Sequence, residues 1–232
     1  MSRPQADPRW LATVACSPLN GRRGQRKLAL VGASAPPGEV PPLEDPSWDV
    51  WSCNALWHLC RDARHRLRAD AWFELHPLSA QTPQELQDME ACPVPLYTLE
   101  ATGAPHWVPY PLEEVRGKFG DRDFFACTFS YQIALALCRG YTTIGLFGVE
   151  LMGGSPRERV HELVSVTYWL GLARGMGVEV FLPDYSRLLW HPLLYGYSYQ
   201  GEDAMVQADL TDLAQAILRD QRKKARPHAQ PV

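Results

Sequence analysis

The stretch KLALVGASAPP, residues 27–37, decides the fold class of this 232-residue chain. Its first part, Lys27 to Val31, is a short apolar run of the kind that forms a strand buried on both faces of a parallel sheet. The run breaks into four small residues, Gly32 to Ala35, and then into two prolines. Ligands of open parallel sheets bind at the carboxyl ends of strands, where small residues allow a close approach to the backbone. The stretch therefore predicts a strand that ends in a binding loop, with a tight structural turn as the alternative.

Other apolar runs of similar length alternate with helical patterns along the chain. The predicted strands are 27–32, 48–53, 71–75, 95–99, 144–149 and 178–182, and the predicted helices are 54–66, 83–90, 111–119, 129–139, 158–175 and 207–224. Helix 129–139 is the clearest, because apolar residues recur on one face between a capping Thr128 and a terminating Gly140. This alternation predicts an α/β, Rossmann-like single domain with a mostly parallel sheet and helices on both faces.

The composition limits the class of protein. With 46% hydrophobic and 21% charged residues, the chain can bury one sizeable core. Its net charge of −3 gives no overall electrostatic case for a nucleic-acid partner. No apolar run approaches the length of about 18 residues that a membrane span needs. The N-terminus lacks an apolar signal region and the six cysteines show no paired spacing, so we expect reduced thiols in a cytoplasmic protein.

The two ends of the chain differ in character from its middle. We expect a flexible N-terminal lead over residues 1–26, a Rossmann-like nucleotide-binding domain over 27–218, and a basic, disordered tail over 219–232. Within the domain, the close spacing of His58, Cys60 and His65 leaves a zinc site open as an alternative.

Polar residues follow several of the predicted strands. Asn54 comes after the second strand, where its amide suits a base edge or a ribose hydroxyl, although it could equally cap the next helix. Thr128 and Ser130 lie where a helix begins and offers free N–H groups to an anion. Glu150 closes the strand that precedes it. With Ser34 of the first loop, these groups predict one nucleotide-binding crevice at the carboxyl edge of the sheet.

These segments resemble a known family. The phrases KLALVGASAP, DVWSCN and TFSYQIALALCRGYTTIGLFGVE are similar to the bacterial sialyltransferases of glycosyltransferase family 42. They are also similar to the related domain that includes archaeal 6-hydroxymethylpterin pyrophosphokinase-like proteins. The likeness covers residues 27–57 and 124–182, about half of the chain. Phage-encoded proteins of this type are the most similar, because they share phrases present here as FELH (73–76), YPLEE (110–114) and YGY (195–197).

The resemblance implies a nucleotide-sugar donor and no required cofactor or metal. The residues that it places at the nucleotide are Gly32, Ala33, Ser34, Asn54, Thr128, Ser130 and Glu150. The sequence departs from the family at three points: the first loop is GASAP where the family has G-x-G-P-S, the S-G at the helix start is Phe129-Ser130, and an Asp of the family is replaced by Glu150. The altered loop leaves the identity of the nucleotide open.

Two histidines are candidates for acid–base catalysis. The resemblance implies a general base at His161, which could instead be an exposed residue in the first turns of a helix. Arg157 and Arg159 lie just before it and could face a leaving phosphate or simply form a solvated helix start. The second candidate is His76 with Glu74, because residues two apart on a strand share a face.

Two further motifs carry alternatives. Tyr195 and Tyr197 lie in an aromatic segment that could form a lid over phosphate or sugar, or a packing arm. Asp121 and Asp123 form a D-x-D string of the kind that binds a metal in many glycosyltransferases, although the resemblance does not require a metal there.

The sequence therefore predicts an enzyme that transfers a sugar from a nucleotide-activated donor to an acceptor such as a glycan or a modified DNA base. One alternative is a Mg²⁺-dependent pyrophosphokinase or phosphohydrolase, in which Glu150, Asp121 and Asp123 would matter more. A catalytically silent nucleotide-binding or interaction protein is the other. The nucleotide, the sugar, the acceptor and the oligomeric state are left open.

Overall fold

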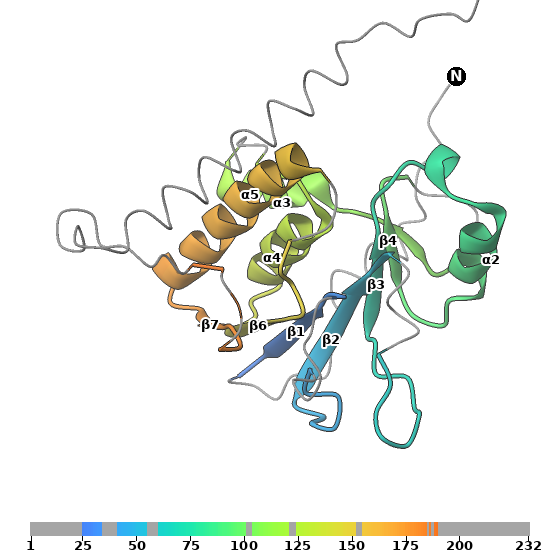
Figure 1. Cartoon of the computed structure of the whole chain (residues 1–232), viewed down its shortest axis with the longest axis horizontal. Helices are drawn as coiled ribbons and strands as arrows, with labels where there is room; N and C mark the ends of the chain where they lie inside the picture. Colours follow the sequence, from blue (N-terminus) through green and yellow to red (C-terminus); the bar gives the residue numbers. More distant parts are fainter. Residues whose placement is uncertain are drawn as a thin grey trace, which may run out of the picture.

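The computed structural model describes residues 25–33, 41–54, 60–100, 104–120, 124–151, 155–184, 186 and 188–189. They form an α/β domain around one sheet (Figure 1). The strands are β1 (Lys27–Val31), β2 (Trp48–Cys53), β3 (Ala71–Glu74), β4 (Leu96–Thr98), β5 (Trp107–Pro109), β6 (Thr143–Phe147) and β7 (Glu179–Phe181). Their order is β5-β4-β3-β2-β1-β6-β7, and each neighbouring pair is parallel. The predicted Rossmann-like fold is confirmed.

Helices cover both faces of the sheet. The described helices are η2 (Leu78–Ala80), α2 (Pro83–Ala91), α3 (Leu112–Phe119), α4 (Thr128–Cys138) and α5 (Pro156–Gly175). In Figure 1, α3, α4 and α5 lie together, whereas α2 stands apart beside β3 and β4. Leu28 and Leu30 of β1 belong to the large core with α4 and α5, whereas the alternate residue Ala29 packs on the opposite face. This period of two explains why the strands are apolar throughout.

The strand order creates a switch point beside β1. The chain runs outward from β1 to β5 and then returns to β6, which pairs with the other edge of β1. Connections on the two sides of such a point leave in opposite directions, so a crevice opens at the carboxyl ends of the two strands. The loop after Val31 therefore lies where the sequence predicts a binding site.

Most predicted elements agree with the structure, and three predictions are wrong in detail. Strand β5 was not predicted. The predicted helix 54–66 is wrong over residues 60–66, which form turns closed by a bridge between Arg61 and Leu67. Thr128 is the first residue of α4 and the cap is Cys127. The predicted helix 207–224, the tail 219–232 and most of the lead 1–26 lie outside the described residues.

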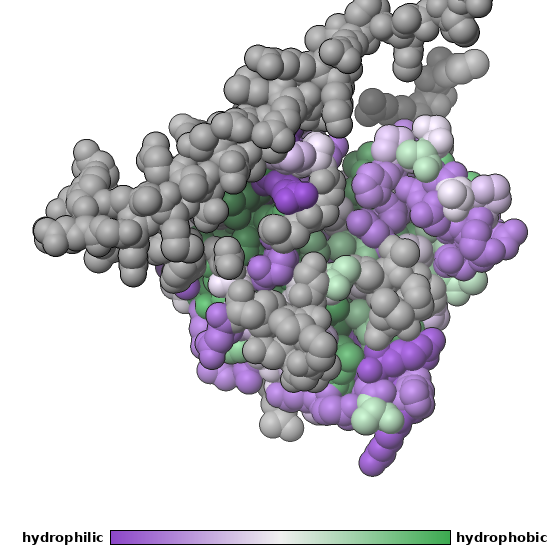
Figure 2. Space-filling model, in the orientation of Figure 1, coloured by the Kyte–Doolittle hydropathy of each residue, from purple (hydrophilic) through white to green (hydrophobic). Residues whose placement is uncertain are grey.

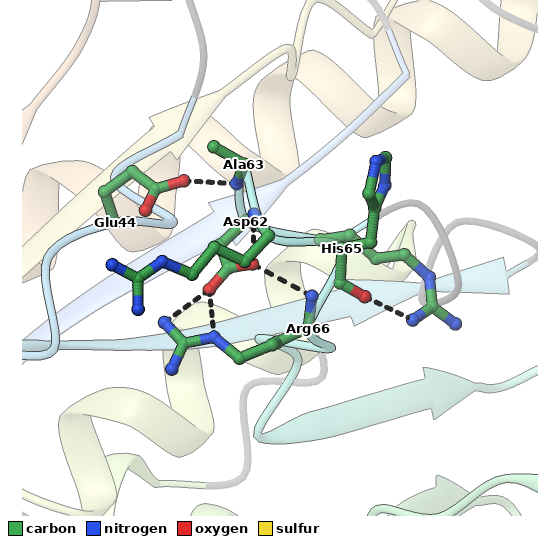
Figure 3. A network of polar contacts seen from close by, with 7 residues as sticks. Glu44, Asp62, Ala63, His65 and Arg66 are labelled. Atoms are coloured by element: carbon green, nitrogen blue, oxygen red, sulfur yellow. Dashed lines mark hydrogen bonds and ion pairs between the residues drawn. The ribbon is translucent and has the colours of Figure 1, made fainter.

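The loop of residues 60–68 owes its shape to one buried carboxylate. Asp62 accepts hydrogen bonds at Oδ1 from the backbone N–H groups of Arg64 and Arg66, both at 2.9 Å. Its Oδ2 lies 2.7 Å from Nε and 2.6 Å from Nη2 of Arg66. Figure 3 shows these contacts, together with that of the Ala63 N–H with Glu44. A short polar segment without a helix is thereby held in one conformation.

The surface of this domain is mixed. Figure 2 shows hydrophilic residues around α2 and along the rim below it, with hydrophobic surface between them. Among the described residues, no helix combines the length and the apolar character that crossing a membrane requires.

Candidate functional site

Two glycines bring the carboxyl ends of β1 and β6 together. The N–H of Gly32 donates to the carbonyl of Phe147 at 2.8 Å. A Cβ atom on Gly32 would lie 2.4 Å from the carbonyl oxygen of Gly148, closer than real Cβ contacts allow. Gly148 itself has a φ of 69°, a conformation that favours glycine. The small residue after the first strand therefore serves a close backbone approach at the switch point.

A cavity of about 620 Å³ opens at this edge of the sheet. That volume lies within the range of small-molecule binding sites. Its apolar walls are Ala33, Leu75, Phe125, Ala126, Phe129, Tyr131, Val149 and Leu151, with Gly148 beside them, and its polar groups are Cys53, Asn54, His76, Cys127, Thr128, Glu150, Glu158 and Glu162. These residues come from the ends of four strands and the starts of α4 and α5, so the fold brings together groups that are far apart in the sequence.

His76 and Glu74 form a hydrogen-bonded pair at the end of β3. Glu74 is 5% exposed, and its Oε1 lies 2.6 Å from His76 Nδ1 and 3.3 Å from the His76 backbone nitrogen. The His76 side chain is 57% exposed and lines the cavity. A carboxylate that accepts the proton on Nδ1 leaves Nε2 as the basic nitrogen, which is the arrangement a general base needs.

The start of α4 presents one predicted residue to the cavity and buries another. Thr128 lines the cavity. Ser130 is fully buried, and its Oγ donates to the carbonyl of Cys127 at 2.6 Å and accepts from the Cys127 N–H at 3.4 Å. Ser130 therefore supports the first turn of the helix and is not among the cavity residues. Burial raises the pKa of the Cys127 thiol to about 11, so this thiol is neutral at pH 7.

Asn54 lies at the end of β2 with a φ of 51° and an exposed side chain in the cavity lining. Asn tolerates this left-handed conformation better than most residues. Ala33 of the first loop also lines the cavity, whereas Ser34 lies outside the described residues.

Three glutamates line the side of the cavity near β6 and α5. Oε1 of Glu150 is buried and has no hydrogen-bond partner among the described residues. Oε2 of Glu158 accepts the N–H of Ser155 at 2.7 Å and so closes the capping box of α5. Burial raises the pKa of Glu162, the neighbouring Glu158 raises it further, and Arg159 opposes the shift.

Other predicted site residues lie elsewhere. His161 is exposed and is not among the cavity residues, and the same holds for Arg157; Arg159 is partly buried and also outside the lining. The residues Asp121, Asp123, Tyr195, Tyr197 and His58 lie outside the described residues. Within the part of the chain that is described, no three His, Cys, Asp or Glu side chains come close enough together to hold a metal.

Five further residues line the cavity that were not predicted from the sequence: Cys53, Cys127, Phe129, Glu158 and Glu162. A signal for the last two was present, because Glu158 and Glu162 are four residues apart on a helix and therefore share a face. His161 lies about 60° around the helix from Glu158 and about 100° from Glu162; of the described residues of α5, Glu158 and Glu162 line the cavity and His161 does not.

No protein-family model and no curated protein matches the chain. Several solved structures are similar to it. One is the monofunctional α-2,3-sialyltransferase Cst-I of Campylobacter jejuni, with 15% identity over 74% of this chain and 81% of that one, and a TM-score of 0.42. Sialyltransferase CstII of the same organism was solved with cytidine monophosphate. It has 15% identity over 68% of this chain and 79% of its own chain, and a TM-score of 0.35. Thiamine pyrophosphokinase of Bacillus subtilis has 15% identity over 68% of this chain and 61% of its own chain, and a TM-score of 0.38.

Proposed function

We propose that this protein is a glycosyltransferase that uses a nucleotide-activated sugar, with His76 as its general base. The observation that carries the proposal is the Glu74–His76 pair. A buried carboxylate orients an imidazole that is itself accessible and lines a cavity at the carboxyl edge of a parallel sheet. Transfer needs such a group, because an acceptor hydroxyl must lose its proton as it attacks.

The rest of the cavity suits the nucleotide of the donor. The first turn of α4 reaches the cavity at Thr128 and Phe129, and the N–H groups and positive dipole of a helix start favour a phosphate. The amide of Asn54 can bind a base edge or a ribose hydroxyl. The motif resemblance found in the sequence points to the same class of donor.

The reaction follows from these positions. Nε2 of His76 takes the proton of the acceptor hydroxyl, and the acceptor oxygen forms a bond to the anomeric carbon of the sugar. The bond between that carbon and the phosphate oxygen breaks, and the nucleotide leaves with the electron pair. Negative charge grows on the departing phosphate, where the start of α4 stabilises it.

The test is a scan of nucleotides by thermal shift, with and without Mg²⁺, followed by turnover measurements on variants. We expect a cytidine or uridine nucleotide to raise the melting temperature without metal. His76→Gln should lower kcat about 10²–10⁴-fold while donor binding is nearly unchanged. His161→Gln, a change at an exposed histidine outside the cavity, is the matched control and should retain turnover.

Two other results would replace the proposal. A nucleoside triphosphate that binds only with Mg²⁺ would indicate a pyrophosphokinase or phosphohydrolase. Full turnover in His76→Gln, with loss in His161→Gln, would return the base to His161.

A further inference from the structure

Helix α5 carries apolar residues on two opposite faces. Its inner face is buried against the rest of the domain through residues such as Val166, Trp169 and Leu170. On the outer face, Leu163 is 45% exposed and Val164 is 49% exposed. A surface helix ordinarily shows one apolar face, whereas a helix that is apolar all round is covered on all sides. The outer face of α5 therefore has the character of a packing surface.

This outer face continues along about three turns of the helix. Val160, Thr167 and Gly171 stand three, four or seven positions from the two exposed residues and share their side of the helix. None of these residues is charged. Arg157 and Arg174 continue the same spacing at the two ends of the face, and both are exposed. The outer face thus fits a partner helix that is apolar in its middle and acidic at its ends.

A segment of the chain beyond the described residues has this complementary pattern. Residues 206–218 read VQADLTDLAQAIL and belong largely to the helix predicted over 207–224. Asp209 and Asp220 stand near the two ends of the segment, about three turns apart and so on one side of it. Its apolar residues recur at the spacing of a single helix face: Val206, Leu210, Leu213, Ala214, Ile217 and Leu218.

The described part of the chain ends close to α5. Leu188 is 4% exposed and belongs to the same hydrophobic core as Trp169 and Leu170 of α5. Residues 190–205 separate this point from the segment. A connection of about 16 residues spans at most about 50 Å, whereas a helix of 20 residues, the length of α5, is about 30 Å long. The segment can therefore reach any part of the outer face.

Charge favours this segment over a second copy of the chain. Two α5 helices packed face to face would bring the arginines at the ends of one near those of the other, where like charges repel. The segment brings aspartates instead. We infer that residues 206–218 form a helix whose apolar face packs on the outer face of α5 in the same chain. Because α5 supplies Glu158 and Glu162 to the cavity, this packing supports one wall of the site from behind.

Charged substitutions in the full chain test the packing. Leu213→Asp/Ile217→Asp places two charges in the contact, so we expect the melting temperature to fall by several degrees and the binding of the apolar dye ANS to rise. Ala208→Asp/Gln215→Asp introduces the same side chains on the opposite face of the segment. This matched control should leave both readings unchanged. Neither reading needs a ligand, so the result is independent of the proposed function.

A double-mutant cycle identifies the surface that the segment contacts. Leu163→Ala/Val164→Ala is combined with Leu213→Ala/Ile217→Ala, and the losses in the free energy of unfolding should not add, because residues in contact are coupled. Leu99→Ala, at an apolar residue that is 48% exposed after β4, replaces the α5 pair as the control and should give additive losses.

Three results would overturn the inference. One is an unchanged melting temperature in Leu213→Asp/Ile217→Asp, and another is additive losses in the cycle with the α5 pair. The third is a dimer in light scattering that Val164→Asp dissociates and Leu213→Asp/Ile217→Asp does not, which would assign the outer face to a second copy. If the aspartate variant fails to fold, the alanine cycle still decides.

Discussion

Two carboxylates in different parts of the molecule have opposite hydrogen-bonding environments. Asp62, in the loop 60–68, has a fully buried side chain whose two oxygens accept three hydrogen bonds from N–H groups and form an ion pair with Arg66. Glu150, in the cavity, has a buried oxygen that receives no hydrogen bond from the part of the chain that the structure describes. A buried acceptor without a donor costs stability, whereas one whose bonds are all made holds the chain in place. The contacts of Asp62 hold the loop in one conformation, whereas the cavity keeps an acceptor oxygen whose hydrogen bonds are not made within the described residues.

The pKa values of carboxyl groups in these two regions are shifted in opposite directions. Burial alone would raise the pKa of Asp62, but the N–H groups of Arg66 and Arg64, with the Arg66 charge, hold it below the ordinary value. In the cavity, burial and the neighbouring Glu158 raise the pKa of Glu162. Surrounding charges favour ionisation in the loop and oppose it at the site.

The largest effect is expected where the loops after β1 and β6 meet. Gly32→Ala places a Cβ, which is fixed rigidly to its Cα, against the backbone carbonyl of Gly148, so neither atom can move without shifting β1 or β6. We expect a loss of about 3 kcal/mol in the free energy of unfolding, measured by urea denaturation. Gly117→Ala is the control, because it lies in α3 with open space around it and should gain about 0.5–1 kcal/mol. Equal stability of the two variants would show that the turns do not touch.

The next effect compares the two acceptors directly. Asp62→Asn removes the charge that holds the loop and leaves an NH₂ group facing N–H donors, so the melting temperature should fall by several degrees. Glu150→Gln removes an unpaired carboxylate oxygen and should leave the melting temperature unchanged or slightly higher. A larger fall in melting temperature in Glu150→Gln than in Asp62→Asn, measured by calorimetry, would contradict this difference between the two regions.

The smallest effect is a difference in pH dependence. A lowered folded-state pKa means that the stability contributed by Asp62 is present above the ordinary Asp pKa and is lost as pH falls through the folded value. The raised pKa of Glu162 acts in the opposite sense, because its favourable contribution is present below the ordinary Glu pKa and is lost as pH rises through the folded value. Asp62→Asn should thus be most damaging near neutral pH, and Glu162→Gln most stabilising there. If the two substitutions changed the free energy of unfolding in the same direction at every pH, this prediction would be wrong.

Local pattern was enough to predict the sheet and most helices. β1, β2, β3 and β6 are apolar runs with little competing signal. The helices predicted over 83–90 and 158–175 begin in the structure with capping boxes at Thr82 and Ser155, which were not predicted. Strand β5 was not predicted because it has three residues and ends in a proline. The helix predicted over 54–66 is wrong over residues 60–66 because the contacts of Asp62 favour turns there.

The site could be predicted only in part, since sequence gives the edge of the sheet but not the direction of each side chain. The placements of Asn54, Thr128, His76 and Glu150 followed from strand ends and helix starts. The burial of Ser130 did not, because it depends on a hydrogen bond made with Cys127 in the helix cap. The exposure of His161 depends on how α5 is rotated against its neighbours, which the packing of the whole domain decides.

The position of β1 in the sheet has a consequence for synthesis of the chain. Its two partners are β2, which follows soon after, and β6, which lies 116 residues further along, as in the pairing of Arg26 with Thr142 at the same end. At the usual rates of translation the second partner appears on the order of ten seconds later. Until then one edge of β1, an interior strand of the sheet, is open to other chains. The cavity also lacks Glu150 and the wall that α5 supplies. The edge of β1 is therefore open to misassociation while about half of the 232-residue chain is made, and the described walls of the cavity are all present only once α5 has followed.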